Sequence, residues 1–222
     1  MGAAFGAILG QAVGVAISPV PIIAVILMLF SKSAKLNSLS FLAGWVIGLL
    51  VVGTIVLASG VTASDGAPST ASGWIKVLIG ALFVALGVKQ WASRPGPGDV
   101  ASVPAWMAKI DDFNATKAFG VGVLLSAVNP KNLGLTMVAA ATIGGSGLST
   151  SDEYVVMVLF VMVASSTVAV PVVLNLILGS KAAATLTSMK EWLTANNATV
   201  MSVLFVVLGA NVFGTGFRQR LL

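Results

Sequence analysis

The sequence predicts an all-α integral membrane protein: a single transmembrane domain over residues 1–222 with six transmembrane helices. We expect these to form two inverted three-helix repeats, with helices one and four broken at proline motifs. The first observation is composition, because 57% of the residues are hydrophobic, 9% are charged and the mean hydropathy is +1.02. A soluble domain would need far more polar surface. The second is that several apolar runs exceed the roughly 20 residues that cross a bilayer.

The spans are expected to be helices because backbone groups in hydrocarbon must be bonded within their own segment. Hydropathy places them at 5–30, 39–60, 73–92, 118–143, 154–179 and 197–217. Basic residues gather in or beside the odd-numbered loops, namely Lys32, Lys35, Lys89, Arg94, Lys109, Lys117, Lys181 and Lys190. The even-numbered loops carry only Asp65, Asp152 and Glu153 among charged residues. The positive-inside rule therefore predicts cytoplasmic odd loops and both termini outside a plasma membrane, although Arg218 and Arg220 oppose this.

The third observation is an internal repeat, which indicates that the chain consists of two similar halves. The run "LFVALGVKQW" at 82–91 matches "LFVVLGANVF" at 204–213, and "ISPVPI" at 17–22 corresponds to "VNPKNL" at 128–133. Three spans per copy is an odd number, so the second copy must enter the membrane from the opposite side. The two repeats are residues 5–92 and 118–217, an architecture typical of secondary transporters.

The connection between the repeats, 93–117, begins with the proline-broken run "SRPGPGDVASVP" at 93–104 and continues as "AWMAKIDDF". In this second part Trp106, Met107, Ile110 and Phe113 share one helical face. The pattern is typical of a short interfacial helix. A plain loop with anchoring aromatic residues is the alternative.

The broken helices supply the candidate site. Pro19 and Pro21 interrupt the first span and Pro130 the fourth. A proline removes a backbone donor and leaves upstream carbonyls free, while the following half-helix begins with a partial positive charge that attracts anions. Lys131 is the only charged residue near the centre of any predicted span. Burying it costs about 2.5–3.5 kcal/mol on insertion scales. Its ammonium is expected to attract an anion at the repeat interface or to cap carbonyls freed by the proline, and both roles are compatible.

Other polar residues in the spans are further candidates. We predict a substrate-binding set of Lys131, Asn129, Asn132, Ser18, Ser165, Ser166 and Thr167, with Pro171 as an additional helix break. Hydroxyls in such helices also commonly bond their own backbone or a neighbouring helix, which is the alternative for each. Glycines at every fourth position from Gly2 to Gly14, and at Gly44 and Gly48, indicate packing surfaces and leave a homodimer open.

Several functional classes are disfavoured. The chain has no cysteine and no histidine, and all seven carboxylates lie outside the predicted spans. We therefore expect no metal site, no cofactor, no intramembrane enzyme and no proton coupling through a buried acid. Nucleic-acid binding is not expected either, because the basic residues are scattered among short loops. The driving force is left open among Lys131 deprotonation, the membrane potential and downhill movement.

Four segments together resemble a known family: "ISPVPIIAVILML", "FLAGWVIGL", "PAWMAKIDDF" and "SAVNPKN". They are similar to the GAP family of the LysE transporter superfamily, the glycopeptidolipid- and sulfolipid-addressing proteins of actinobacterial envelopes. The resemblance runs from about Leu9 to the sixth span. It implies a six-helix transporter-like protein of the plasma membrane that moves envelope lipids beside larger lipid transporters. It also places Pro19, Pro21, Asn129, Pro130, Lys131 and Asn132 in the superfamily's hairpin motifs. The superfamily's thiol-electron carriers and metal exporters differ from this chain, which lacks cysteine, histidine and intramembrane acids.

The sequence thus favours a flippase-like exporter of an anionic envelope lipid, glycolipid or precursor that works by alternating access. Its expected partners are membrane lipids, the anionic substrate and a larger lipid transporter. Two alternatives are a small amino-acid or organic-anion exporter and a non-transporting accessory scaffold for a larger lipid exporter.

Overall fold

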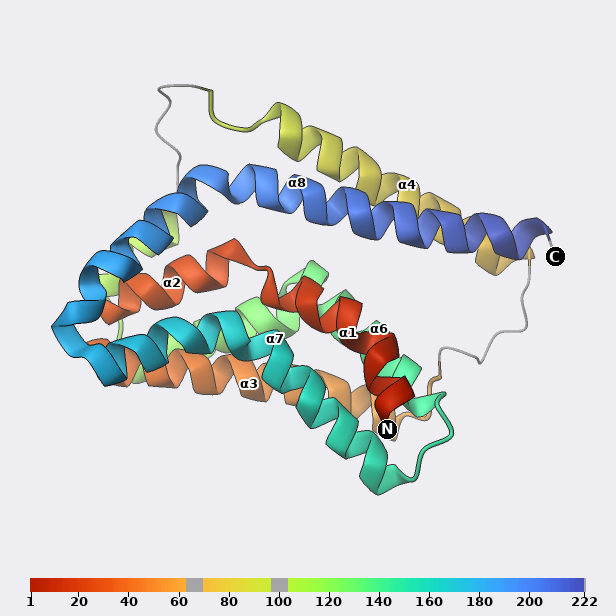
Figure 1. Ribbon diagram of the computed structural model, residues 1–222, viewed down its shortest axis with the longest axis horizontal. Coiled ribbons are helices and arrows are strands. Elements are labelled where there is room, and N and C mark those ends of the chain that lie inside the picture. Colours follow the sequence, from red (N-terminus) through yellow and green to blue (C-terminus); the bar gives the residue numbers. More distant parts are fainter. Residues whose placement is uncertain (63–69, 97–103, 222) are drawn as a thin grey trace. The chain divides into compact units, whose positions relative to one another are not determined.

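The computed structural model describes residues 1–62, 70–96 and 104–221, and these are almost entirely helical, with no strand among them (Figure 1). An all-α fold is therefore confirmed. Asp65 of the second loop and most of the predicted flexible run 93–104 lie outside the described residues. The chain divides into two compact units, residues 1–63 with 103–191 and residues 64–102 with 192–222.

The first unit contains most of the helices. They are α1 (Gly2–Ala16), α2 (Pro19–Leu29), α3 (Ala34–Ala58), the 3₁₀ helix η1 (Ala105–Asp112), α5 (Ala115–Val123), the π-helical turn η2 (Leu124–Val128), α6 (Pro130–Gly144), α7 (Thr150–Leu178) and the 3₁₀ turn η3 (Gly179–Ala182). The second unit contains α4 (Thr70–Ala92) and most of α8 (Ala183–Leu221).

Membrane-spanning helices are present. Ala34–Ala58 and the helical run Thr150–Thr215 are long and apolar enough to cross a bilayer, and the bent pair α1–α2 makes a third candidate. The predicted loop between the fifth and sixth spans is wrong in extent, because α8 is already helical from Ala183. Residues 183–196 contain neither glycine nor proline, so nothing in this stretch ends a helix. The break is confined to η3, which starts at Gly179 with a φ of 55°.

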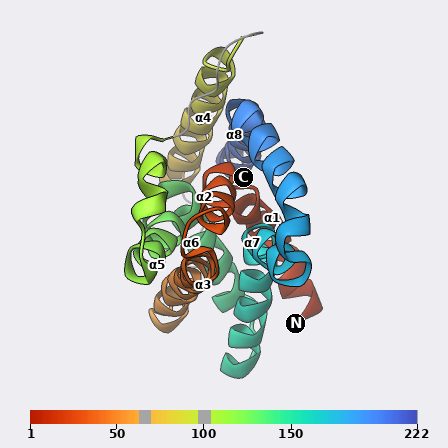
Figure 2. The ribbon, with the colours of Figure 1, turned by 90° about the vertical axis from the view of Figure 1, so that its left-hand side faces the viewer.

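The short helix α2 forms the centre of the first unit. Nine of its eleven residues are buried, including Ile22, Val25 and Met28. A helix that is apolar on every side is stable only when it is surrounded. In the first unit α2 packs against α3, α7 and η1, and Figure 2 shows it in the middle of this group. The first proline motif therefore leads directly into the core.

The helix η1 covers one end of α2. Met107 and Ile110 are 3% and 2% exposed, a spacing of three that matches the 3₁₀ repeat. The segment is helical, as predicted, in the 3₁₀ form, and Met107 and Ile110 are buried within the protein; its position at the membrane interface stays a prediction. Asn37 Nδ2 donates to the carbonyl of Phe113 over 2.9 Å, which attaches the end of η1 to the start of α3.

Glycines join α3 to α5. A Cβ on Gly44 would collide with the carbonyl of Phe119, one on Gly48 with the Ser126 hydroxyl, and one on Gly122 with the carbonyl of Phe41. The predicted packing role of Gly44 and Gly48 is therefore confirmed. The prediction is wrong for Gly2, Gly6 and Gly10, where a Cβ would meet nothing within 4 Å.

In the second unit α4 and α8 pack through equivalent residues of the internal repeat. Gly87 lies against Val206 and the Ser202 carbonyl, and Gly209 lies against Val84 and the Gly80 carbonyl. The Ser202 hydroxyl also donates to the Gly87 carbonyl over 2.7 Å. The matching runs 82–91 and 204–213 are 122 residues apart in the sequence. By this spacing Gly87 corresponds to Gly209, Val84 to Val206 and Gly80 to Ser202, so the two glycine contacts are equivalent.

The rings of Phe83 and Phe205, which are equivalent under the same offset, have centroids 5.8 Å apart. A residue that meets its own counterpart marks a local twofold axis between two antiparallel helices. The pairing of α4 with α8 is therefore locally twofold symmetric.

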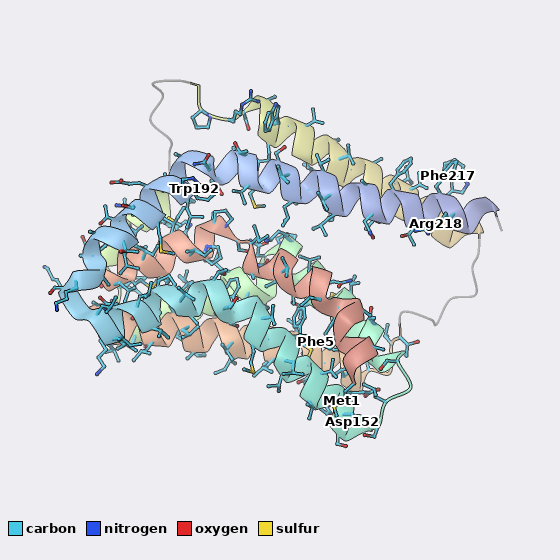
Figure 3. The ribbon with its side chains drawn as sticks, viewed as in Figure 1. Met1, Phe5, Asp152, Trp192, Phe217 and Arg218 are labelled. Atoms are coloured by element: carbon cyan, nitrogen blue, oxygen red, sulfur yellow. The ribbon has the colours of Figure 1, made fainter. Side chains whose placement is uncertain are left out.

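Charge differs between the two ends of the first unit. The starts of α1 and α7, marked by Met1 and Asp152 in Figure 3, lie at one end, which carries Asp152 and Glu153. Packing of α2 on η1 and of α3 along α5 gathers basic residues at the other end. These are Lys32, Lys35, Lys109 and Lys117.

Candidate functional site

Both predicted helix breaks are present, and in each a proline begins the second half-helix. The chain bends by 54° between α1 and α2, with Pro19 in the first turn of α2. The second break consists of the π turn η2, Asn129 and then Pro130 in the first turn of α6. Proline suits this position because its fixed φ is helical and the missing N–H would have had no intrahelical acceptor. The prolines thus start helices rather than kink them.

Lys131 reaches from α6 to the end of α1. Its Nζ donates to the carbonyls of Gly14 and Ile17, each over 2.9 Å, and to the hydroxyl of Ser18 over 2.6 Å. The side chain is only 8% exposed. An ammonium has three N–H donors, and here all three have acceptors. The two broken helices are therefore joined by one buried cation.

The last carbonyls of α1 are all bonded. Ile17 N donates to Val13 O over 2.8 Å, the Ser18 hydroxyl to Val15 O over 2.7 Å, and the Thr167 hydroxyl to Ala16 O over 2.6 Å. Lys131 binds the remaining one, Gly14 O. The break therefore does remove helical backbone donors from the end of α1, and Lys131 of α6, Ser18 and Thr167 of α7 bind the freed carbonyls, which agrees with the capping role predicted for the ammonium. A cation is favoured here because a helix ends with a partial negative charge.

The two asparagines have different roles. Asn132 is fully buried; its Nδ2 donates to the carbonyl of Leu125 in η2 over 2.8 Å, and its Oδ1 lies 3.2 Å from the Ser18 hydroxyl oxygen. The Ser18 hydroxyl has one proton, and Val15 O at 2.7 Å is the nearer of its two acceptors. Asn129 caps its own helix, with Oδ1 accepting from Lys131 N over 3.1 Å. Only Asn132 therefore links the two breaks, while Asn129 fixes the start of α6.

The three adjacent hydroxyl residues of α7 point in different directions. Thr167 binds α1, Ser165 is buried without a hydrogen-bond partner among the described residues, and exposed Ser166 donates to the carbonyl of Val163. Successive residues on a helix are about 100° apart, so one face cannot hold all three. In this conformation Ser166 therefore bonds its own helix, and its role in substrate binding stays a prediction. Pro171 is not a break, because α7 continues through it.

The half-helix N-termini offer less positive charge than expected. Pro19 and Pro21 remove two of the first three N–H groups of α2, and the Lys131 N–H at the start of α6 is bonded to Asn129. The ammonium of Lys131 is therefore the main positive charge at the two breaks.

Sequence reasoning did not identify two of the groups that bind Lys131. These are the carbonyls of Gly14 and Ile17, because backbone atoms have no residue-type signal. Thr136, a polar residue of the fourth predicted span, follows Asn132 by one helical turn and lies on the same helix face. Its hydroxyl and Trp45 Nε1 are buried without a hydrogen-bond partner among the described residues. The described residues contain no group of three or more histidine, cysteine or acidic residues that could hold a metal ion.

Thr167 gives a test of the cap on α1. Replacing Thr167 with valine keeps the shape but removes one of the two donors to the Ala16 carbonyl, the other being Ser18 N, so we expect a loss of about 1 kcal/mol in unfolding free energy. Ser166→Ala on the same helix is the control and should change stability by less than about 0.5 kcal/mol, because that hydroxyl is exposed and local. Thermal unfolding in detergent measures both, and equal effects would contradict the assigned role of Thr167.

Comparison with known families gives one assignment. The model of the family described as "Sap, sulfolipid-1-addressing protein" matches residues 8–218, which is nearly the whole chain. No curated protein and no solved structure matches. The match includes both proline motifs, Lys131 and the matching runs in α4 and α8. The chain therefore belongs to the sulfolipid-1-addressing protein family.

Proposed function

We propose that this protein is a flippase-like secondary transporter that exports an anionic envelope lipid, glycolipid or lipid precursor by alternating access. Membership of the family named for sulfolipid-1 supports a lipid-related role in export or localisation at the membrane. A sulfolipid combines a polar head with a hydrocarbon tail. The tail can stay in the bilayer, so the protein needs to provide a path only for the head.

The observation that carries this proposal is the contact of Lys131 with α1. The ammonium is bonded to neutral carbonyl and hydroxyl groups, and an anionic head would be a stronger acceptor for it. A lipid head that binds Lys131 therefore competes with the carbonyls of Gly14 and Ile17 and loosens α6 from α1. This exchange of partners links substrate binding to movement of the broken helices.

Inverted three-helix repeats, 5–92 and 118–217, are part of the proposal. The repeats make α1, α2 and α3 equivalent to α5, α6 and α7. In the first unit the contact of α3 with α5 then corresponds to that of α7 with α1. The contact of α3 with α6 likewise corresponds to that of α7 with α2. The local twofold contact of α4 with α8 agrees with the same equivalence. The proposal accordingly includes six transmembrane spans, with the first and fourth broken.

The charge distribution supports an orientation. Lys32, Lys35, Lys109 and Lys117 occur at one end of the first unit, and Asp152 and Glu153 at the other. The positive-inside rule places the basic end in the cytoplasm of a plasma membrane, with both termini outside. Export then runs from the basic end towards the starts of α1 and α7.

The test is reconstitution of the purified protein in liposomes. A head-labelled sulfated lipid should cross to the opposite leaflet much faster than with empty vesicles, and faster than a zwitterionic lipid of the same chain length. A membrane-impermeant quencher of the label measures the fraction transferred.

Other outcomes would replace the proposal. Amino-acid efflux without lipid transfer would favour the small-solute exporter. No transfer in liposomes, together with loss of the lipid from the surface of a deletion strain, would favour an accessory scaffold for a larger lipid transporter. Chemical conversion of the lipid would favour an enzyme, for which the spans offer no acid–base constellation.

A further inference from the structure

The end of α1 surrounds a single point with oxygen atoms. The carbonyl oxygens of Gly14 and Ile17 and the hydroxyl oxygen of Ser18 lie 2.9, 2.9 and 2.6 Å from Lys131 Nζ. Ser18 is 4% exposed, and its hydroxyl lies 3.2 Å from Oδ1 of the fully buried Asn132. The point is thus enclosed, polar and lined by oxygen.

We propose that this point is a binding site for a small monovalent cation, which the ammonium of Lys131 occupies in the observed conformation. The site takes Na⁺, K⁺ or a small alkylammonium ion whenever the lysine side chain is elsewhere. Unwound carbonyls and the C-terminal end of a half-helix are suitable ligands, because their dipoles direct negative charge at the same point.

The ligand chemistry selects the charge of the ion. All three ligands of Nζ are neutral oxygens, and Asn132 adds only an amide oxygen beside them. Divalent cations such as Ca²⁺ require more oxygen ligands, usually with several carboxylates. Every carboxylate of the chain lies outside the predicted spans. The site therefore compensates one positive charge and not two.

Loss of the lysine ammonium removes one positive charge and three hydrogen-bond donors from the end of α1. The acceptors Gly14 O, Ile17 O and Ser18 Oγ would be left in an enclosed place without a donor, beside the negative end of α1. A free cation restores both the charge and the contacts. The wild-type chain already has a tethered cation, so its stability should not depend on the choice of monovalent salt.

This has a consequence for transport, which rests on the proposed function. When an anionic lipid head draws Lys131 away from α1, a cation from solution can take the vacated position and hold the end of α1. Lys131 and the free cation then occupy the same position in turn, so the lysine takes the place that a coupling ion has in other transporters. The cation site itself is testable without any transport.

The test compares purified Lys131→Ala and wild-type protein in detergent. Thermal unfolding is measured in sodium, potassium, methylammonium and N-methylglucamine chloride at equal ionic strength. We expect the variant to melt at least about 3 °C higher in one or more of the small cations than in N-methylglucamine, and the wild type to show no such difference.

Second-site variants identify the ligands. Adding Ser18→Ala to Lys131→Ala removes a proposed ligand and should weaken the cation effect. Adding Thr167→Val removes a hydroxyl that caps α1 without contacting Nζ, so it should leave the effect in place. Lys131→Met is the second variant at the site and should also be recovered in higher yield in small cations than in N-methylglucamine.

The contradicting results are equally specific. The cation site would be overturned if both Lys131 variants had the same stability and yield in all four salts. Failure to recover either variant in any salt would overturn it as well. An equal cation effect in the wild type would overturn it too. Lipid transfer in liposomes is measured separately on the wild type, so failure of this inference is distinguishable from failure of the proposed function.

Discussion

Replacing Lys131 with glutamine should reduce lipid transfer in liposomes at least about tenfold, with normal insertion in the membrane. Glutamine keeps a donor but loses the charge that holds α6 to the end of α1 and that would attract an anionic head. Hydrogen bonds to a charged group contribute about 1.5–3 kcal/mol each, and about 1.4 kcal/mol corresponds to a factor of ten. Losing even one such bond to the substrate therefore accounts for the expected reduction. Initial transfer rates at equal protein content measure it.

Lys117→Gln is the matched control for this variant. Lys117 undergoes the same chemical change in α5, the helix that leads into the same break, but its side chain is exposed and bonds no part of α1 in the described structure. Its transfer rate should stay within about twofold of the wild type, because isolated surface charges contribute little. Wild-type transfer by Lys131→Gln would remove Lys131 from the mechanism.

Gly122→Ala should be strongly destabilising, as should Gly44→Ala, whose Cβ would collide with the carbonyl of Phe119 across the same contact. The new Cβ would collide with the carbonyl of Phe41 and lie 2.9 Å from the backbone nitrogen of Trp45. These are backbone atoms of α3, which cannot rotate away as a side chain can. We expect a loss of about 3 kcal/mol, at the upper part of the usual range for overpacking, because α3 and α5 must separate. The apparent melting temperature in detergent measures the loss.

Gly120→Ala provides the opposite expectation on the same helix. A Cβ at Gly120 meets nothing within 4 Å, so the added methyl should improve helix propensity by about 0.5–1 kcal/mol. The two variants have identical composition, which makes the difference in sign a direct measure of the α3–α5 contact. Equal melting temperatures for both would mean that this contact does not limit stability.

The sequence was most informative where chemistry is unusual for a bilayer. A lysine beside a proline in an apolar run predicted both the second helix break and a polar contact there, and the first break followed from Pro19 and Pro21. Of the three acceptors of Lys131, Ser18 was in the predicted set, whereas the carbonyls of Gly14 and Ile17 could not be predicted because they are backbone groups more than a hundred residues away. The sequence predicted two compatible roles for the ammonium, attraction of an anion and capping of carbonyls. Only the structure shows that it caps carbonyls in this conformation.

Other differences come from packing that residue type does not encode. The run 165–167 suggested three candidate ligands, but helix rotation gives each hydroxyl a different neighbour. The apolar face of 105–113 suggested a membrane surface, and the structure shows that two of its residues, Met107 and Ile110, are buried in the protein, where η1 packs on α2. Pro171 has the same residue type as Pro19, yet Pro19 begins a helix and Pro171 lies inside one. Local sequence thus indicated where polarity occurs, and tertiary contacts decided what it binds.

The meeting of Phe83 with Phe205 has a consequence for assembly. A contact in which each residue faces its own counterpart is available to two separate copies of one sequence. Under the proposed inverted repeat, one three-span peptide inserted in both orientations would have the residues to dimerise through this helix pair. Expressing residues 1–92 and 118–222 as separate peptides should accordingly still yield a complex.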